Sequence, residues 1–179
     1  MKNKSQNETD LRQLLEDQLK DVYWAEKAIT KAMPEMVDKV ESQELVEALT
    51  EHMEETIQQV TRLENVFEIL GIPAEAKKCE AMDGLIEEAE DIADDLDEGP
   101  VRDAGIIAAA QKIEHYEIAT YGSLRAFANI LGEFEAASLF EETLEEEKAA
   151  DKRLTDLAES VINIEAAHEG GTSSTTSQF

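Results

Sequence analysis

The sequence contains a single cysteine, Cys79, among its 179 residues. One cysteine forms neither an internal disulfide nor the cluster of thiolates that a rubredoxin-like iron site needs. Long apolar segments are missing too, because no apolar run reaches the ~18 residues of a membrane-spanning helix. The N-terminal residues also lack the apolar region of a secretory signal. We therefore expect a cytoplasmic protein with no membrane partner.

Positive charge is scarce. The chain has 16 lysines and arginines against 42 aspartates and glutamates, which gives a net charge of −26. Such an excess repels phosphate groups at long range, so it excludes nucleic acids and anionic membranes as partners and favours cations. Most of the acids, such as those in residues 90–98, are expected to form a solvated surface. Only acidic side chains that point inward need a special explanation.

The interior of the chain has no linker rich in proline, glycine or serine, and no stretch alternates long enough to predict a strand. We expect one all-α domain over residues 10–166, with a flexible N-terminus (1–9) and a disordered tail (167–179). The periodicity and end signals predict four long helices and one shorter helix, with Ser42 as an N-cap and Gly71 and Gly132 as stop signals. The four long helices are expected at 10–39, 42–71, 101–131 and 133–164, and the shorter one at 76–96.

The lengths of the connections choose among helical bundles. The first and second long helices are joined by a tight turn, and so are the third and fourth. About thirty residues separate the second from the third, which is enough to travel the full length of a bundle. This plan is typical of a ferritin-like four-helix bundle with one long helical crossover.

Three glutamates, Glu26, Glu117 and Glu147, each lie in the middle of an apolar stripe with helical spacing. An unpaired ionised carboxylate in a core is strongly unfavourable, so such groups are protonated, paired or bound to a metal. Three of them together favour a metal, although a buried network of ion pairs without a metal stays open.

The register of the helices extends this set. Glu26 and Glu55 are 29 residues apart, and Glu117 and Glu147 are 30 apart, so in two antiparallel hairpins the four carboxylates reach one level. Glu55 lies at the edge of its stripe, and His52 lies nearer the centre. Further candidates lie within one turn of these positions. The complete set of predicted metal ligands is Glu26, Glu55, Glu114, Glu117, Glu147, Asp151 and His52. Gln59 is expected to hydrogen-bond a ligand, and Tyr23 and Tyr121 are expected at the same level, either to hydrogen-bond ligands or to pack in the core.

Oxygen donors with little imidazole suit iron or manganese better than a metal that prefers thiolates. We therefore expect two iron ions, with manganese as the alternative. The Glu-x-x-His pair that such bundles use is absent, since His52 precedes Glu55 and Ala150 stands three residues after Glu147.

Several stretches of the chain also resemble a known family. The blocks "EHMEETIQQVTRLE", "VRDAGIIAAAQKIEHYEIATYGSL" and "TLEEEKAADKRLTDLA" are similar to the YciE/YciF-like stress-associated proteins of the ferritin-like superfamily, over about residues 10–160. The resemblance implies a bundle with a di-metal centre, rubrerythrin-like in its helices, and a homodimer. The acidic positions of that family fall on Glu26, Glu55, Glu114, Glu117, Glu147 and Asp151.

Two functions remain open from the sequence. The first is a stress protein whose iron or manganese centre carries out redox chemistry with iron, oxygen or peroxide. The second is a non-catalytic bundle that holds a structural cation and acts through its surface as an interaction or protective protein. The sequence does not decide whether the protein is an enzyme.

Overall fold

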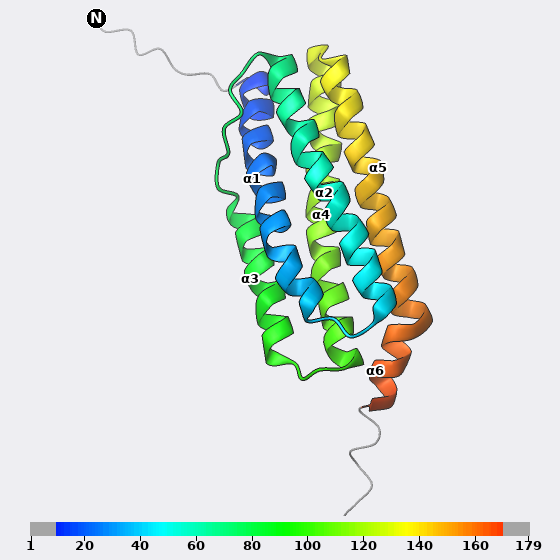
Figure 1. Cartoon of the computed structure of the whole chain (residues 1–179). Coiled ribbons are helices and arrows are strands. Elements are labelled where there is room, and N and C mark those ends of the chain that lie inside the picture. The colour runs from blue at the N-terminus through cyan, green and yellow to red at the C-terminus, as the bar shows by residue number, and fades with distance from the viewer. Residues whose placement is uncertain (1–9, 170–179) are drawn as a thin grey trace, which may run out of the picture.

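The computed structural model describes residues 10–169, and within this range the chain is helical apart from its connections and has no strand. Four long helices lie side by side along a common direction (Figure 1). They are α1 (Leu11–Asp38), α2 (Gln43–Leu70), α4 (Pro100–Leu131) and α5 (Phe134–Leu157). The shorter α3 (Glu80–Asp95) lies in the connection from α2 to α4, and a π-helical turn (Ala158–Ile162) joins α5 to α6 (Asn163–Glu169). The all-α prediction is confirmed.

Local signals in the sequence set the ends of the long helices. The side chain of Asp10 accepts a hydrogen bond from the Gln13 backbone N–H at 2.9 Å and caps α1. Ser42 caps α2 in the same way. Helices α2 and α4 end at Gly71 and Gly132, whose φ angles of 68° and 80° lie in the left-handed region that glycine tolerates best.

The four long helices pack as a ring. Helix α1 contacts α2 and α4, and α5 contacts the same two helices, while α3 lies outside against α1 and α4. The described residues form three apolar clusters, of which one, containing Ile29 and Met82, packs α3 against α1 and α4, and the other two fill the two ends of the bundle. Of these two end clusters, one contains Leu15, Leu19, Phe67 and Phe140, and the other contains Leu45, Ile106 and Leu154. The inward glutamates occupy the segments between these clusters, so the bundle has a polar layer across its middle.

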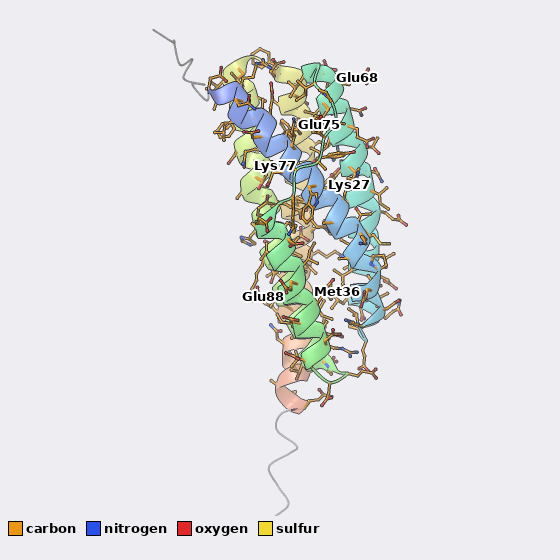
Figure 2. The ribbon with its side chains drawn as sticks, turned by 90° about the vertical axis from the view of Figure 1, so that its left-hand side faces the viewer. Lys27, Met36, Glu68, Glu75, Lys77 and Glu88 are labelled. Atoms are coloured by element: carbon orange, nitrogen blue, oxygen red, sulfur yellow. The ribbon has the colours of Figure 1, made fainter. Side chains whose placement is uncertain are left out.

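The connection from α2 to α3 begins as an extended segment beside α1. The Lys77 N–H donates to the Lys20 carbonyl at 3.0 Å, and the Lys20 ammonium lies 2.8 Å from Glu75. Figure 2 shows Glu75 and Lys77 along α1, before the chain enters α3. Helix α3 therefore begins at Glu80, later than the predicted residue 76, because backbone bonding to α1 holds the preceding residues extended.

The C-terminal helical segment is longer than expected. The chain continues from α5 through the π-helical turn into α6, which ends at Glu169. Residues 167–169, which the sequence analysis assigned to a disordered tail, are thus helical. The rest of that tail and the predicted flexible N-terminus lie outside the described residues.

Helix α4 is tied to its neighbours near its N-terminus. The buried Asp103 carboxylate accepts hydrogen bonds from the N–H groups of Glu41 and Ser42, at 3.1 and 2.8 Å, and so holds the turn between α1 and α2. Two residues further on, a Cβ at Gly105 would lie 2.8 Å from the Ile92 side chain. The absence of a side chain at Gly105 lets α3 approach α4 closely.

Candidate metal centre

Four buried side chains from three helices converge in the polar layer. His52 comes from α2, Glu114 and Glu117 from α4, and Glu147 from α5. Each offers one donor atom, and these atoms all lie within 4.8 Å of one another. Glu26 from α1 is completely buried, and its carboxyl group interacts with that of Glu117. All four long helices therefore contribute to one polar group, and the inward direction predicted for Glu26, Glu117 and Glu147 is confirmed.

His52 has acidic side chains on both edges of its ring. Its Nε2 atom lies 3.2 Å from Glu114 Oε1 and 3.7 Å from Glu147 Oε2, while Nδ1 lies 3.6 Å from Glu55 Oε2. The side chain of Glu55 is 48% exposed, whereas that of His52 is 8% exposed. Helix α2 thus contributes His52 to the cluster and leaves Glu55 at its outer side, because Glu55 lies at the edge of the helical stripe.

Asp151, another predicted ligand, lies outside the cluster. Its carboxylate accepts a hydrogen bond from Gln111 Nε2 at 2.9 Å and lies 3.3 Å from Nε2 of His115. The side chain of His115 is 69% exposed, so this pair belongs to the surface. One helical turn carries α5 from the buried Glu147 to this outer position.

Neighbouring side chains hold the carboxylates by hydrogen bonds. Tyr121 donates its hydroxyl proton to Glu26, and Gln59 Nε2 donates to Glu147 and, at 3.1 Å, to Glu146. The sequence predicted such roles for Gln59 and Tyr121. It also offered Tyr23, which donates to Glu64 at 2.8 Å, outside the cluster. It missed Arg62, whose guanidinium lies 2.7 Å from Glu146. The sequence shows only that Arg62 and Glu146 carry opposite charges. It does not show that their two helices are in contact at these positions.

Burial governs the protonation of the cluster. It raises the pKa of Glu26 to about 7, against the lowering effects of the hydrogen bonds from Tyr121 and Glu117. Burial also raises the pKa of Glu117 and Glu147 well above the ordinary range, and neighbouring carboxylates add to this increase. For His52, burial is the largest single effect and lowers the pKa, but Glu114, Glu55 and Glu147 together outweigh it, so the net shift of the pKa is upward. The metal-free cluster therefore retains protons at neutral pH.

The cluster has unused acceptor atoms. One oxygen of each of four carboxyl groups is buried and has no hydrogen-bond partner, namely Oε2 of Glu26, Glu114, Glu117 and Glu147. Buried polar atoms are nearly always satisfied, so four such atoms in one layer require an explanation. Carboxylate oxygens with one imidazole form a suitable donor set for iron or manganese. The residues present fit such a metal.

Comparisons with known proteins place the chain in a family. Residues 10–167 match the family model described as "Domain of unknown function (DUF892)". The chain belongs to this DUF892 family. It is 45% identical to protein YciF of Escherichia coli strain K12 over 152 residues. This matched region covers 84% of this chain and 92% of YciF. The predicted resemblance to YciF-like proteins is confirmed.

Solved structures agree with this assignment. The crystal structure of the E. coli stress protein YciF matches with a TM-score of 0.83 and 44% identity, over 86% of this chain and 98% of YciF. YcfI of Rhodopseudomonas palustris matches with a TM-score of 0.81 and 42% identity, over 84% of this chain and 96% of YcfI. A protein of Xanthomonas campestris matches with a TM-score of 0.72 and 26% identity, over 90% and 99% of the two chains. This DUF892 chain therefore shares its helical fold with YciF.

Within residues 10–169, no helix combines the length and the apolar character needed to cross a membrane.

Proposed function

We propose that this DUF892 protein is a ferritin-like bundle that binds two iron or manganese ions in its polar layer. The observation that carries the proposal is the convergence of three buried glutamates on one buried imidazole, each glutamate having an oxygen without a hydrogen-bond partner. Without cations, these acceptors would be desolvated with no compensation. Metal binding supplies that compensation and displaces the protons that the raised pKa values retain.

The contacts divide the ligands into two overlapping groups. His52, Glu114 and Glu147 contact one another and would hold one ion. Glu26 and Glu117 interact with each other and would hold the second ion. Glu117 is common to both groups because its donor atom also lies near His52. Bound iron or manganese would supply redox chemistry toward oxygen or peroxide. The chain itself orients the carboxylates through Tyr121 and Gln59 and shields them from water.

The biological setting is proposed from the relatives. E. coli YciF is described as a stress protein, and it is similar to this chain over nearly its whole length. We propose that this chain acts in a stress response in the cytoplasm, as a homodimer, in keeping with the family resemblance.

A second function has its own support. The cluster contains one imidazole, whereas di-iron bundles with two Glu-x-x-His motifs have two. A poor supply of imidazole favours a structural cation in a non-catalytic bundle that acts as an interaction or protective protein. This alternative predicts bound metal without an accelerated reaction.

Elemental analysis of protein purified without chelator, and of protein loaded anaerobically with Fe(II) or Mn(II), tests the proposal. We expect close to two ions per chain and a lower content in Glu117→Gln. Glu54→Gln is a matched control, because Glu54 is exposed on α2 and lies outside the cluster. A chain that takes up no metal under any of these conditions would show that the buried carboxyl groups serve as a protonated network.

A further inference from the structure

Two cavities adjoin the metal centre and share Leu49, His52 and Glu114 in their walls. The first, of about 130 Å³, lies between α2 and α5 and has Glu51, Glu55 and Arg153 in its lining. The second, of about 60 Å³, lies among α1, α2, α3 and α4. Apart from His52 and Glu114, only apolar side chains line the second cavity. His52 and Glu114 thus lie between a polar space and an apolar one.

The polar cavity connects the surface with the centre. Glu51, Glu55 and Arg153 are exposed, whereas His52 and Glu114 are buried. The atoms Nδ1 of His52 and Oε2 of Glu114 are buried without hydrogen-bond partners. Donor atoms follow one another inward, because Glu55 Oε2 lies 3.6 Å from His52 Nδ1 and His52 Nε2 lies 3.2 Å from Glu114 Oε1.

We propose that this polar cavity is the passage through which divalent cations reach the metal centre, and that Glu55 is the carboxylate that first receives them. The inference rests on the metal binding proposed above. A cation loses its hydration water at high cost unless oxygen or nitrogen donors replace it along the way. Glu55, His52 and Glu114 offer such donors in sequence, and the apolar cavity has none before it reaches His52 and Glu114.

Small side chains keep the passage open. Ala48, Ala149 and Ala150 line it where α2 and α5 face each other. Ala150 occupies the position, three residues after Glu147, at which a Glu-x-x-His motif would place an imidazole. The missing histidine therefore leaves space beside the centre, and a larger residue at position 150 would occupy it.

Arg153 modifies the mouth of the passage. It is the only basic residue in the lining other than His52, and its guanidinium is paired with the carboxylate of Glu51. A fixed positive charge at the mouth slows an approaching cation. Removing this charge should speed uptake, whereas removing the charge of Glu55 should slow it.

Stopped-flow binding of Co(II) to the metal-free full chain, followed by the visible absorbance of the bound ion, tests the passage. We expect Glu55→Gln to slow uptake about three- to tenfold, and to slow release to a strong chelator by a similar factor. Arg153→Gln should speed uptake about two- to fivefold. The amount of Co(II) bound at equilibrium should not change in either variant. Glu54→Gln and Lys152→Gln are matched controls, since both residues are exposed neighbours outside the lining.

A third variant, Ala150→Leu, should slow uptake and release more than Glu55→Gln does, and circular dichroism reports whether it is folded. The exposed Glu55 and Arg153 variants decide the matter if Ala150→Leu fails to fold. If the wild type binds Co(II) and Glu55→Gln takes it up at the same rate as Glu54→Gln, the proposed passage would be overturned. The proposed metal centre would not be affected by that result. A reduced amount of bound Co(II) in Glu55→Gln would overturn the transit role, because it would make Glu55 a ligand. Failure of the wild type to bind Co(II), Fe(II) or Mn(II) would overturn the proposed function itself.

Discussion

The hydroxyl of Tyr121 on α4 donates a hydrogen bond to Glu26 on α1, and both side chains are completely buried. Tyr121→Phe removes the hydroxyl donor, so the Glu26 oxygen loses this hydrogen bond. We expect the metal-free protein to lose about 1–3 kcal/mol of unfolding free energy at pH 8, measured by urea denaturation. Metal affinity should also fall, because Glu26 is then less firmly held.

Tyr23 offers a matched control for this substitution. Its hydroxyl donates to Glu64 at 2.8 Å, outside the cluster. Tyr23→Phe should leave metal affinity unchanged. Equal effects of the two substitutions on metal binding would contradict the supporting role of Tyr121.

The raised pKa of Glu26 predicts how the stability of metal-free protein depends on pH. The pKa rises from 4.5 to about 7 on folding, so the contribution of this group to stability is fully present below pH 4.5 and is lost as the pH rises to about 7. The loss amounts to about 3 kcal/mol. Glu117, Glu147 and His52 also have raised pKa values and act in the same direction. Chemical denaturation in the presence of chelator between pH 5 and 8 should show decreasing stability, and Glu26→Gln should flatten the curve. An unchanged slope in Glu26→Gln would contradict the assignment.

Metal should reverse the effect of removing a charge from the centre. Glu147→Gln should stabilise the metal-free protein at pH 8, because it removes a repelling carboxylate, and should destabilise the loaded protein, because it removes a ligand. Thermal unfolding with and without Mn(II) measures both. Equal destabilisation of the two forms would indicate a structural ion pair in place of a metal site.

Two glycines of α4 should respond to alanine in opposite directions. Gly105 lies against Ile92 and Leu96, where a Cβ would approach to 2.8 and 3.0 Å. Gly105→Ala should therefore destabilise the protein by about 1–3 kcal/mol. A Cβ at Gly122 would meet open space, so Gly122→Ala should stabilise the protein by about 1 kcal/mol through the higher helix propensity of alanine. Urea denaturation of both variants tests the packing of α3 on α4, and stabilisation by Gly105→Ala would contradict it.

A kinetic measurement separates the redox protein from the structural-cation alternative. Protein loaded anaerobically with Fe(II) should be oxidised by hydrogen peroxide faster than free Fe(II), as followed by stopped-flow absorbance. Glu117→Ala should remove the acceleration, whereas loaded Glu55→Gln should retain it, since Glu55 lies outside the cluster. Traces no faster than free Fe(II) would favour the structural cation.

The sequence predicted the helices and the inward glutamates because both depend on periodicity and local end signals. Glu26, Glu117 and Glu147 interrupt apolar stripes, and all three are buried. The choice between His52 and Glu55 was harder, since a small rotation of α2 decides which side chain enters the bundle. Asp151 follows the same helical period as Glu147, but one turn takes it to the surface beside His115. Such differences depend on how each helix is rotated and tilted in the bundle, which its own sequence does not encode.

The hydrogen-bonded support of the centre was the least predictable part. Arg62 and Glu146 act on Glu147 only through Gln59, and these contacts join α2 to α5. Pairing across two helices requires their register and facing sides. The late start of α3 has a similar cause, because the bond between Lys77 and Lys20 is a tertiary contact.

The alanine at position 150 has a consequence for how long the proposed metal centre would keep its ions. An opening beside a binding site lowers the barrier for departure by the same amount as the barrier for arrival, so it leaves occupancy at equilibrium unchanged. A centre with such an opening exchanges its ions with the surrounding solution and follows changes in their free concentration. Ala150→His would both add a donor and narrow the opening. A centre that exchanges its ions readily would then become one that retains them.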